Sequence, residues 1–117
     1  NNLLGIVGPC SAGKTTLIDK LEKLGYACRH IAQEHSYVPE MWLKIVNPRV
    51  LIYLDVGYET SMQRRYLNLS SKDFDDQVKR LAHARNNAHI YVDTESLSPD
   101  EVYREVINAL ERLSVDP

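Results

Sequence analysis

The stretch that decides the fold is GPCSAGKT, residues 8–15, which matches the pattern G-x-x-x-x-G-K-[ST] at every defined position. The apolar run LLGIV (residues 3–7) precedes it, and a segment with leucines at helical spacing, residues 14–24, follows it. A near-continuous apolar run is typical of a strand buried in the middle of a parallel sheet. The sequence therefore predicts a strand, a glycine-bounded loop and an amphipathic helix in direct succession.

The residue types in this loop suit a bound polyphosphate. Glycines at both ends let backbone N–H groups wrap around an anion, and the following helix presents its positive end to that anion. Lys14 is predicted to contact the β and γ phosphates, and the Thr15 hydroxyl to ligate Mg²⁺. The predicted nucleotide-contacting residues are Gly8, Pro9, Cys10, Ser11, Ala12, Gly13, Lys14, Thr15 and Thr16. The alternative, a glycine-rich turn with a solvated lysine, is disfavoured by the flanking strand and helix.

The rest of the chain alternates strand-like and helix-like segments, which is the pattern of βαβ units and a parallel sheet. Further strands are predicted at residues 28–32, 50–56 and 89–93, and further helices at 39–46, 58–69 and 71–86. Ser98, Pro99 and Glu101 predict a capping box that opens a last helix. The inward positions predicted for that helix are Val102, Val106, Leu110 and Leu113.

Length and composition restrict the class of protein. The chain has 117 residues, 44% of them hydrophobic and 26% charged, with a formal net charge of −2. These values favour one globular domain over residues 1–117, with a short, polar, lid-like segment at about 68–85. The near-neutral charge argues against binding a nucleic-acid duplex by bulk charge.

Targeting and metal patterns are not recognised in the sequence. No apolar run approaches the roughly 20 residues of a bilayer span, and no signal-peptide pattern is found, so we expect no membrane partner and a cytoplasmic location. The two cysteines, Cys10 and Cys28, lack the spacing of a zinc or redox site, and the histidines form no metal-binding pair. Reduced thiols and no structural metal are expected.

Three stretches resemble the nucleoside and nucleotide kinase group of P-loop proteins, which includes adenylate kinase-like and shikimate kinase-like members. They are GPCSAGKTT (8–16), VLIYLDVGYETSMQRR (50–65) and AHIYVDTESLSPDEVYREVINAL (88–110), and the resemblance covers nearly the whole chain. It implies a three-layer α/β fold, ATP and Mg²⁺ as cofactors, and a loop at residues 94–98 that borders the nucleotide base.

The resemblance also implies arginines that clamp the transferring phosphoryl group, because its transition state needs positive charge. Arg64 matches the first of these by position, and Arg65, Arg80 and Arg85 are candidates for the others. The alternative is that these arginines lie on solvated helix faces and form weak surface ion pairs.

The chain departs from the family pattern between the first helix and the strand at 50–56. Residues 25–49 leave room for one strand, so we predict a mostly or wholly parallel four-stranded sheet in the order 2-1-3-4, with helices on both faces. The strand that is missing carries, in the family, the acidic residue that holds Mg²⁺ or activates the acceptor. Glu34 is the nearest replacement, as a metal ligand through water or as a general base, and an exposed loop carboxylate is the alternative.

An acceptor pocket would have to come from the same short region. His35, Tyr37 and Trp42 are candidates to line it, although core packing is the stronger expectation for Trp42. The sequence thus predicts a small kinase-like phosphotransferase that uses ATP and Mg²⁺ on an unidentified small-molecule acceptor. Two alternatives stay open: a nucleotide-binding module, and a slow NTPase that is completed by another chain, for example as a homo-oligomer.

Overall fold

The computed structural model describes residues 2–65 and 68–117, and its centre is a four-stranded sheet. The strands are β1 (Leu4–Val7), β2 (Cys28–His30), β3 (Val50–Asp55) and β4 (Ile90–Asp93). They are all parallel and lie in the order β2-β1-β3-β4, so the predicted strand order is confirmed. Leu4 pairs with both Cys28 and Val50, which places β1 inside the sheet.

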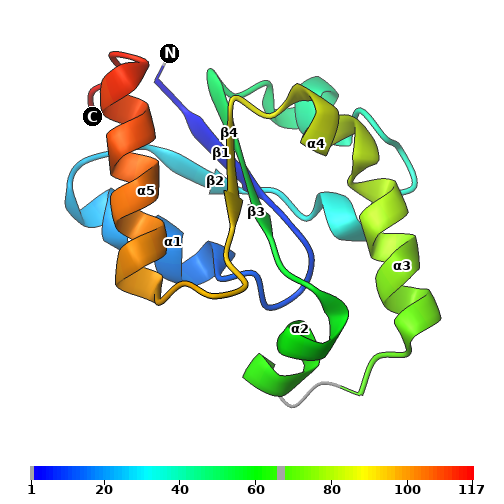
Figure 1. The fold of residues 1–117 in the computed structure, drawn as a ribbon. Coiled ribbons are helices and arrows are strands. Elements are labelled where there is room, and N and C mark those ends of the chain that lie inside the picture. Colours follow the sequence, from blue (N-terminus) through cyan, green and yellow to red (C-terminus); the bar gives the residue numbers. More distant parts are fainter. Residues whose placement is uncertain (1, 66–67) are drawn as a thin grey trace.

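Helices cover both faces of the sheet (Figure 1). They are α1 (Lys14–Lys23), α2 (Tyr58–Arg65), α3 (Ser71–Arg80), α4 (Ala82–Asn87) and α5 (Pro99–Arg112), with a 3₁₀ turn η1 (Gln33–His35) and a π-helical turn η2 (Trp42–Val46). Helices α1 and α5 lie on one face, α3 and α4 on the other, and α2 lies beyond the carboxyl ends of the strands. Within residues 2–65 and 68–117, no helix combines the length and the apolar character that crossing a membrane requires.

The two inner strands, β1 and β3, are buried on both faces, as their continuous apolar runs predict, whereas β2 and β4 at the edges of the sheet have exposed residues. Along β3, Ile52 and Leu54 belong to a cluster with residues of α1 and α5, whereas Leu51 and Tyr53 belong to a cluster with Leu81, where α3 meets α4, and with Ala84 of α4. We call these two apolar clusters the α1/α5 side and the α3/α4 side. Trp42 belongs to the α3/α4 side and is 5% exposed, so the expectation that it is a core residue is confirmed.

The last helix differs from its prediction at its end. The capping box at Ser98 and the burial of Val102, Val106 and Leu110 are confirmed. The inward position predicted for Leu113 is wrong, because this residue is the C-cap and is 46% exposed. Ser114 has a left-handed φ of 57°, which turns the chain back so that Val115, with its N–H on the Leu110 carbonyl, fills the core instead.

The polar stretch after α2 also differs from its prediction. The helix expected over 71–86 is interrupted at Leu81, and both Leu81 and Ala84 are fully buried against the sheet. The helix expected over 58–69 is described as far as Arg65; residues 66–67 lie outside the described residues, and 68–70 are not helical. Because Phe74 and Gln77 of α3 are buried, this segment has anchors in the protein, and its role as a lid stays a prediction.

Candidate functional site

The loop of residues 8–15 joins β1 to α1 at the carboxyl edge of the sheet, and both of its defined glycines are required by the geometry. A Cβ atom on Gly8 would lie 2.2 Å from the Leu54 carbonyl oxygen of β3, so a side chain there would collide with backbone. Gly13 is the N-cap of α1 and has a φ of 96°, which is the left-handed region that favours glycine. One glycine permits a close approach, and the other permits the turn into the helix.

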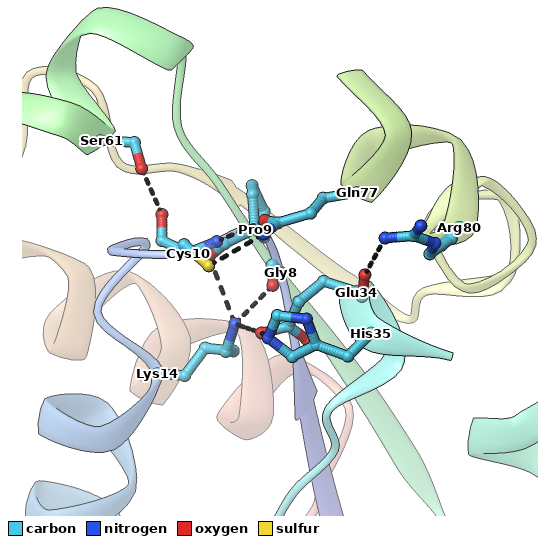
Figure 2. A network of polar contacts seen from close by, with 9 residues as sticks. All are labelled: Gly8, Pro9, Cys10, Lys14, Glu34, His35, Ser61, Gln77 and Arg80. Carbon is cyan, nitrogen blue, oxygen red and sulfur yellow. Dashed lines mark hydrogen bonds and ion pairs between the residues drawn. The ribbon is translucent and has the colours of Figure 1, made fainter. Parts of the chain in front are cut away.

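Lys14 is folded back into the loop and is only 7% exposed (Figure 2). Its Nζ donates to the carbonyl oxygens of Gly8 and Pro9, the latter at 3.2 Å, and to Oε2 of Glu34 at 2.8 Å. Desolvating an ammonium group is costly unless it is paired and hydrogen-bonded, and these three oxygens supply that compensation. The lysine of the motif therefore lies at the centre of a buried polar cluster.

Glu34 is the carboxylate of this cluster. It lies in η1 just after β2, the strand next to β1, and it is 3% exposed, so the alternative of an exposed loop carboxylate is wrong. Its Oε2 pairs with Lys14, whereas its Oε1 is buried without a hydrogen-bond partner among the described residues. Unpartnered buried oxygens are rare in folded proteins, so this one points to a site for a further ligand.

The turn that carries Glu34 is held by Gln33, which is fully buried. The Gln33 side-chain amide donates to the Val38 carbonyl at 2.9 Å, and its oxygen accepts from the Trp42 backbone N–H at 2.9 Å. Gln33 was not identified from the sequence, because the sequence pattern around a glutamine after a short strand does not distinguish a solvated side chain from a buried one.

Cys10 is held in place by side chains from two other helices (Figure 2). Gln77 of α3 accepts from the Cys10 backbone N–H at 3.2 Å and donates to its sulfur at 3.1 Å. Ser61 of α2 donates to the Cys10 carbonyl at 2.6 Å. Neither Gln77 nor Ser61 was identified from the sequence, because their neighbours along each helix are mostly polar and exposed. The loop conformation thus depends on residues more than 50 positions away.

Two cavities meet at the first turn of α1, where Gly13 and Thr16 line both of them. The first has a volume of about 520 Å³ and is lined by Cys10, Ser11, Gly13, Lys14, Thr15, Thr16, His30, Ala32, Glu34, His35 and Arg65. The second has a volume of about 280 Å³ and is lined by Ala12, Gly13, Thr16, Leu17, Arg64, Leu97, Pro99 and Val102. The first cavity is therefore charged and polar, whereas the second is largely apolar with one arginine.

His30 is a basic group in the first cavity whose charge depends on its surroundings. Burial and the nearby Lys14 ammonium lower the pKa of His30 below its ordinary value. The lowered pKa favours the neutral imidazole. Lys14 and Arg65 are therefore the main positive charges among the residues that line this cavity.

Arg64 and Arg65, at the end of α2, lie beside different cavities. Arg64 donates to the Ser11 carbonyl at 3.1 Å, and to the hydroxyl and carbonyl of Thr94 at 3.0 and 2.6 Å. Its guanidinium is thus fixed against the loop at the second cavity, whereas Arg65 lines the first. Among the described residues, neither Arg64 nor Arg65 forms the surface ion pairs that were the alternative.

The other two candidate arginines differ in position. Arg80 of α3 donates to the Glu34 carbonyl at 3.3 Å and lies over the exposed Tyr37 ring, 4.7 Å from its centroid. Arg85 lines neither cavity; it lies 3.9 Å from the Asp55 carboxylate and packs on Tyr91. Of the residues considered for an acceptor pocket, His35 lines the first cavity and Trp42 lies in the core.

Comparisons with known proteins do not assign the site. No protein-family model matches this chain, and a search of curated proteins finds no significant match.

Proposed function

We propose that the chain binds a nucleoside triphosphate through the loop of residues 8–15, as a P-loop protein, and acts as a small kinase-like phosphotransferase. The single observation that carries this proposal is the buried cluster in which Lys14 is held by two loop carbonyls and Glu34, at the start of α1. This cluster supports a site in which the Lys14 ammonium exchanges its present oxygen partners for the oxygens of a phosphate. We expect the protein to work in the cytoplasm.

The phosphate-binding part of the proposal rests on the first cavity. The N–H groups in the first turn of α1 have no intrahelical partners and point toward the loop, so they favour an anion. Ser11 Oγ is buried there without a hydrogen-bond partner among the described residues, and it is a further donor for a phosphate oxygen. Lys14 and Arg65 supply positive charge at the same cavity.

The adjoining second cavity supports a nucleotide rather than an inorganic phosphate. Leu17, Leu97 and Val102 provide apolar walls, and the Arg64 guanidinium is already fixed by Thr94. A planar base can pack between such walls and an arginine plane. A ligand with a charged chain at one end and a flat ring at the other therefore fits the two cavities together.

The oxygen donors near the loop fit Mg²⁺, which prefers oxygen ligands. Thr15 and Glu34 line the first cavity, and both would hold the ion directly or through water. Bound Mg²⁺ would neutralise charge on the β and γ phosphates. When Lys14 turns to the phosphates, Glu34 loses its ammonium partner, and its carboxylate becomes available to a cation or to an acceptor hydroxyl.

In the proposed transfer, Glu34 takes the proton of the acceptor hydroxyl while the acceptor oxygen bonds to the γ phosphorus. The bond from that phosphorus to the β–γ bridging oxygen breaks, and the nucleoside diphosphate leaves. Arg64, Arg65 and Arg80 remain proposed phosphate contacts, of which Arg65 has the most direct access to the first cavity. Arg85 is the weakest of the proposed contacts, because Asp55 and Tyr91 already hold it elsewhere.

A second candidate is a nucleotide-binding module or a slow NTPase. It is favoured by the segment between β2 and β3, whose turns η1 and η2 are tied into the core by Gln33 and Trp42. This arrangement leaves the acceptor little beyond the first cavity. No nucleic-acid duplex is expected as a partner.

The test combines calorimetry with turnover. We expect Mg·ATP to bind the parent protein, and Lys14→Ala to weaken binding about 10- to 100-fold, because it loses a charged hydrogen bond to phosphate. The matched control is Lys23→Ala, an exposed lysine of the same helix, which should leave binding unchanged. Failure of the parent to bind any of ATP, GTP or their diphosphates would overturn the proposal.

Turnover then separates the two candidates. With a panel of nucleosides, nucleotides and small alcohols, the kinase proposal predicts phosphorylated product. Glu34→Gln should lower turnover by a larger factor than it lowers Mg·ATP affinity, because the amide oxygen can still face the ion but cannot take a proton. Tight binding with no transfer to any acceptor would favour the binding module or the NTPase instead.

A further inference from the structure

Three side chains that can ligate a metal lie close together beside the loop of residues 8–15. Their spacing along the sequence does not match a metal-binding pattern. Cys10 comes from the loop, and Glu34 and His35 come from the turn after β2. One ligand atom from each residue lies within 4.8 Å of the other two, and Figure 2 shows the three side chains around the Lys14 ammonium. The Glu34 Oε2 and His35 Nε2 atoms are 4.0 Å apart.

A second, independent observation points to a ligand at this cluster. Oε1 of Glu34 has no hydrogen-bond partner among the described residues. Because the residue is only 3% exposed, solvent does not satisfy this oxygen either. Gln77 also fixes the position of the Cys10 sulfur by a 3.1 Å hydrogen bond, so the thiol is directed by the fold. The oriented sulfur lies within 4.8 Å of a carboxylate oxygen of Glu34, and the same carboxylate has an oxygen without a partner, so the cluster is a partial coordination shell.

The donor set selects the kind of metal. A thiolate, an imidazole and a carboxylate together are ligands of Zn²⁺, at about 2.0–2.3 Å, whereas Mg²⁺ and Ca²⁺ prefer oxygen alone. Ligands of a tetrahedral ion at those distances stand roughly 3.5 Å apart. The cluster must therefore contract slightly, and His35 can supply this movement because its side chain is 61% exposed.

We propose that Cys10, Glu34 and His35 bind one Zn²⁺ ion, and that the zinc-bound form excludes a nucleotide. On binding, the Cys10 thiol releases its proton to solvent, the thiolate bonds to zinc, and zinc replaces the Lys14 ammonium as the counter-charge of Glu34. The exclusion follows because Cys10 belongs to the loop that must close around phosphate. The exclusion of the nucleotide rests on the proposed function, whereas the zinc site itself does not.

The test of the site uses metal alone, without nucleotide. Titration of the reduced, full chain with Co²⁺ should give one bound ion, with a thiolate-to-cobalt band in the near ultraviolet that Zn²⁺ abolishes by displacement. Cys10→Ser should remove the band, and His35→Ala should weaken metal affinity at least about tenfold. The matched control Cys28→Ser should leave both unchanged, because Cys28 lies on β2 and packs against the α1/α5 side.

The outcomes test the zinc site and the exclusion of the nucleotide separately. Absence of the band, its loss in Cys28→Ser, or unchanged affinity in His35→Ala would overturn the zinc site, provided circular dichroism shows each variant folded. If the site holds, Zn²⁺ should weaken binding of the nucleotide to the parent and not to Cys10→Ser, and an equal effect on both would overturn the exclusion. Failure of the parent to bind any nucleotide would instead count against the proposed function.

Discussion

The two faces of the sheet are covered in different ways. On the α1/α5 side the contacts are almost wholly apolar, and they join β1, β3 and β4 to the buried stripes of two regular helices. On the α3/α4 side the apolar cluster is smaller, and buried polar side chains such as Gln33 and Gln77 complete it. Trp42 also donates its indole N–H to His83 at 3.0 Å on that side.

The difference teaches where this protein keeps its chemistry. Glu34 lies in the turn that packs against α3, and Gln77 and Arg80 of α3 contact the loop or the Glu34 backbone. An apolar layer gives non-directional stability, whereas hydrogen bonds fix individual atoms. The α1/α5 side therefore holds the sheet together, and the α3/α4 side orients the residues that surround the loop.

The largest effect should come from breaking the α1/α5 side. Leu110→Ala, at a fully buried position of α5, should lower the free energy of unfolding by about 2–5 kcal/mol, because it leaves a cavity in an apolar layer. Denaturation by urea measures this, with the exposed Leu113→Ala as the control. A loss in Leu110→Ala no greater than in Leu113→Ala would contradict the importance given to this side.

Breaking the polar part of the α3/α4 side should have a smaller effect. Gln33→Ala removes the partners of the Trp42 N–H and the Val38 carbonyl, so we expect a loss of about 1–3 kcal/mol in unfolding free energy. The control is Gln63→Ala, an exposed residue of α2. Because Gln33 holds the turn of Glu34, the variant should also disturb the site, which Leu110→Ala should not. Equal stability of the Gln33 and Gln63 variants would refute this account.

The helix caps of the two sides sharpen the comparison further. Ser98, the N-cap of α5, is part of a reciprocal capping box, whereas the hydrogen bond that Ser70, the N-cap of α3, makes within residues 68–117 is the one it accepts from the Asp73 N–H at 3.1 Å. Ser98→Ala should therefore cost about 1 kcal/mol, and Ser70→Ala about half as much. Thermal unfolding of the two variants side by side checks the order, and a larger loss in Ser70→Ala would reverse the interpretation.

The last effect concerns alkaline pH, and at neutral pH it vanishes because the Cys28 thiol keeps its proton in both states. Burial, and then the Glu22 carboxylate, raises the pKa of the Cys28 thiol to about 11, from an ordinary value of 9.0. Between these values the unfolded chain has lost the proton and the folded chain keeps it, so stability falls as pH rises through this window. Urea denaturation from pH 8 to 11 should show a steeper fall in the parent than in Cys28→Ser, and parallel curves would exclude this role.

Much of the fold was predictable, because its signals are local or periodic. Apolar runs predicted β1 and β3, weaker strand-like segments predicted β2 and β4, and the short segment after α1 predicted the order of the sheet, which is confirmed. The failures have local physical causes. Leu113 was placed inward by helical period, whereas the turn at Ser114 brings Val115 into the core, and a periodic pattern does not include such a turn.

The candidate site was predictable only in part. The glycines and Lys14 form a contiguous motif, and the prediction of Glu34 beside the loop came from the strand order. Gln33, Ser61 and Gln77 could not be identified, because a polar residue that becomes buried by long-range packing resembles a solvated one in the sequence.

By itself, the sequence determined the βαβ order, the parallel sheet and the glycine-bounded loop at its carboxyl edge, because hydrophobic period and backbone freedom act over a few residues. Only the tertiary structure decided that Lys14 pairs with a buried Glu34, that Gln77 orients Cys10, and that a charged cavity adjoins an apolar one. These features depend on burial and on distances between residues far apart in the chain. Both quantities arise only when the layers pack.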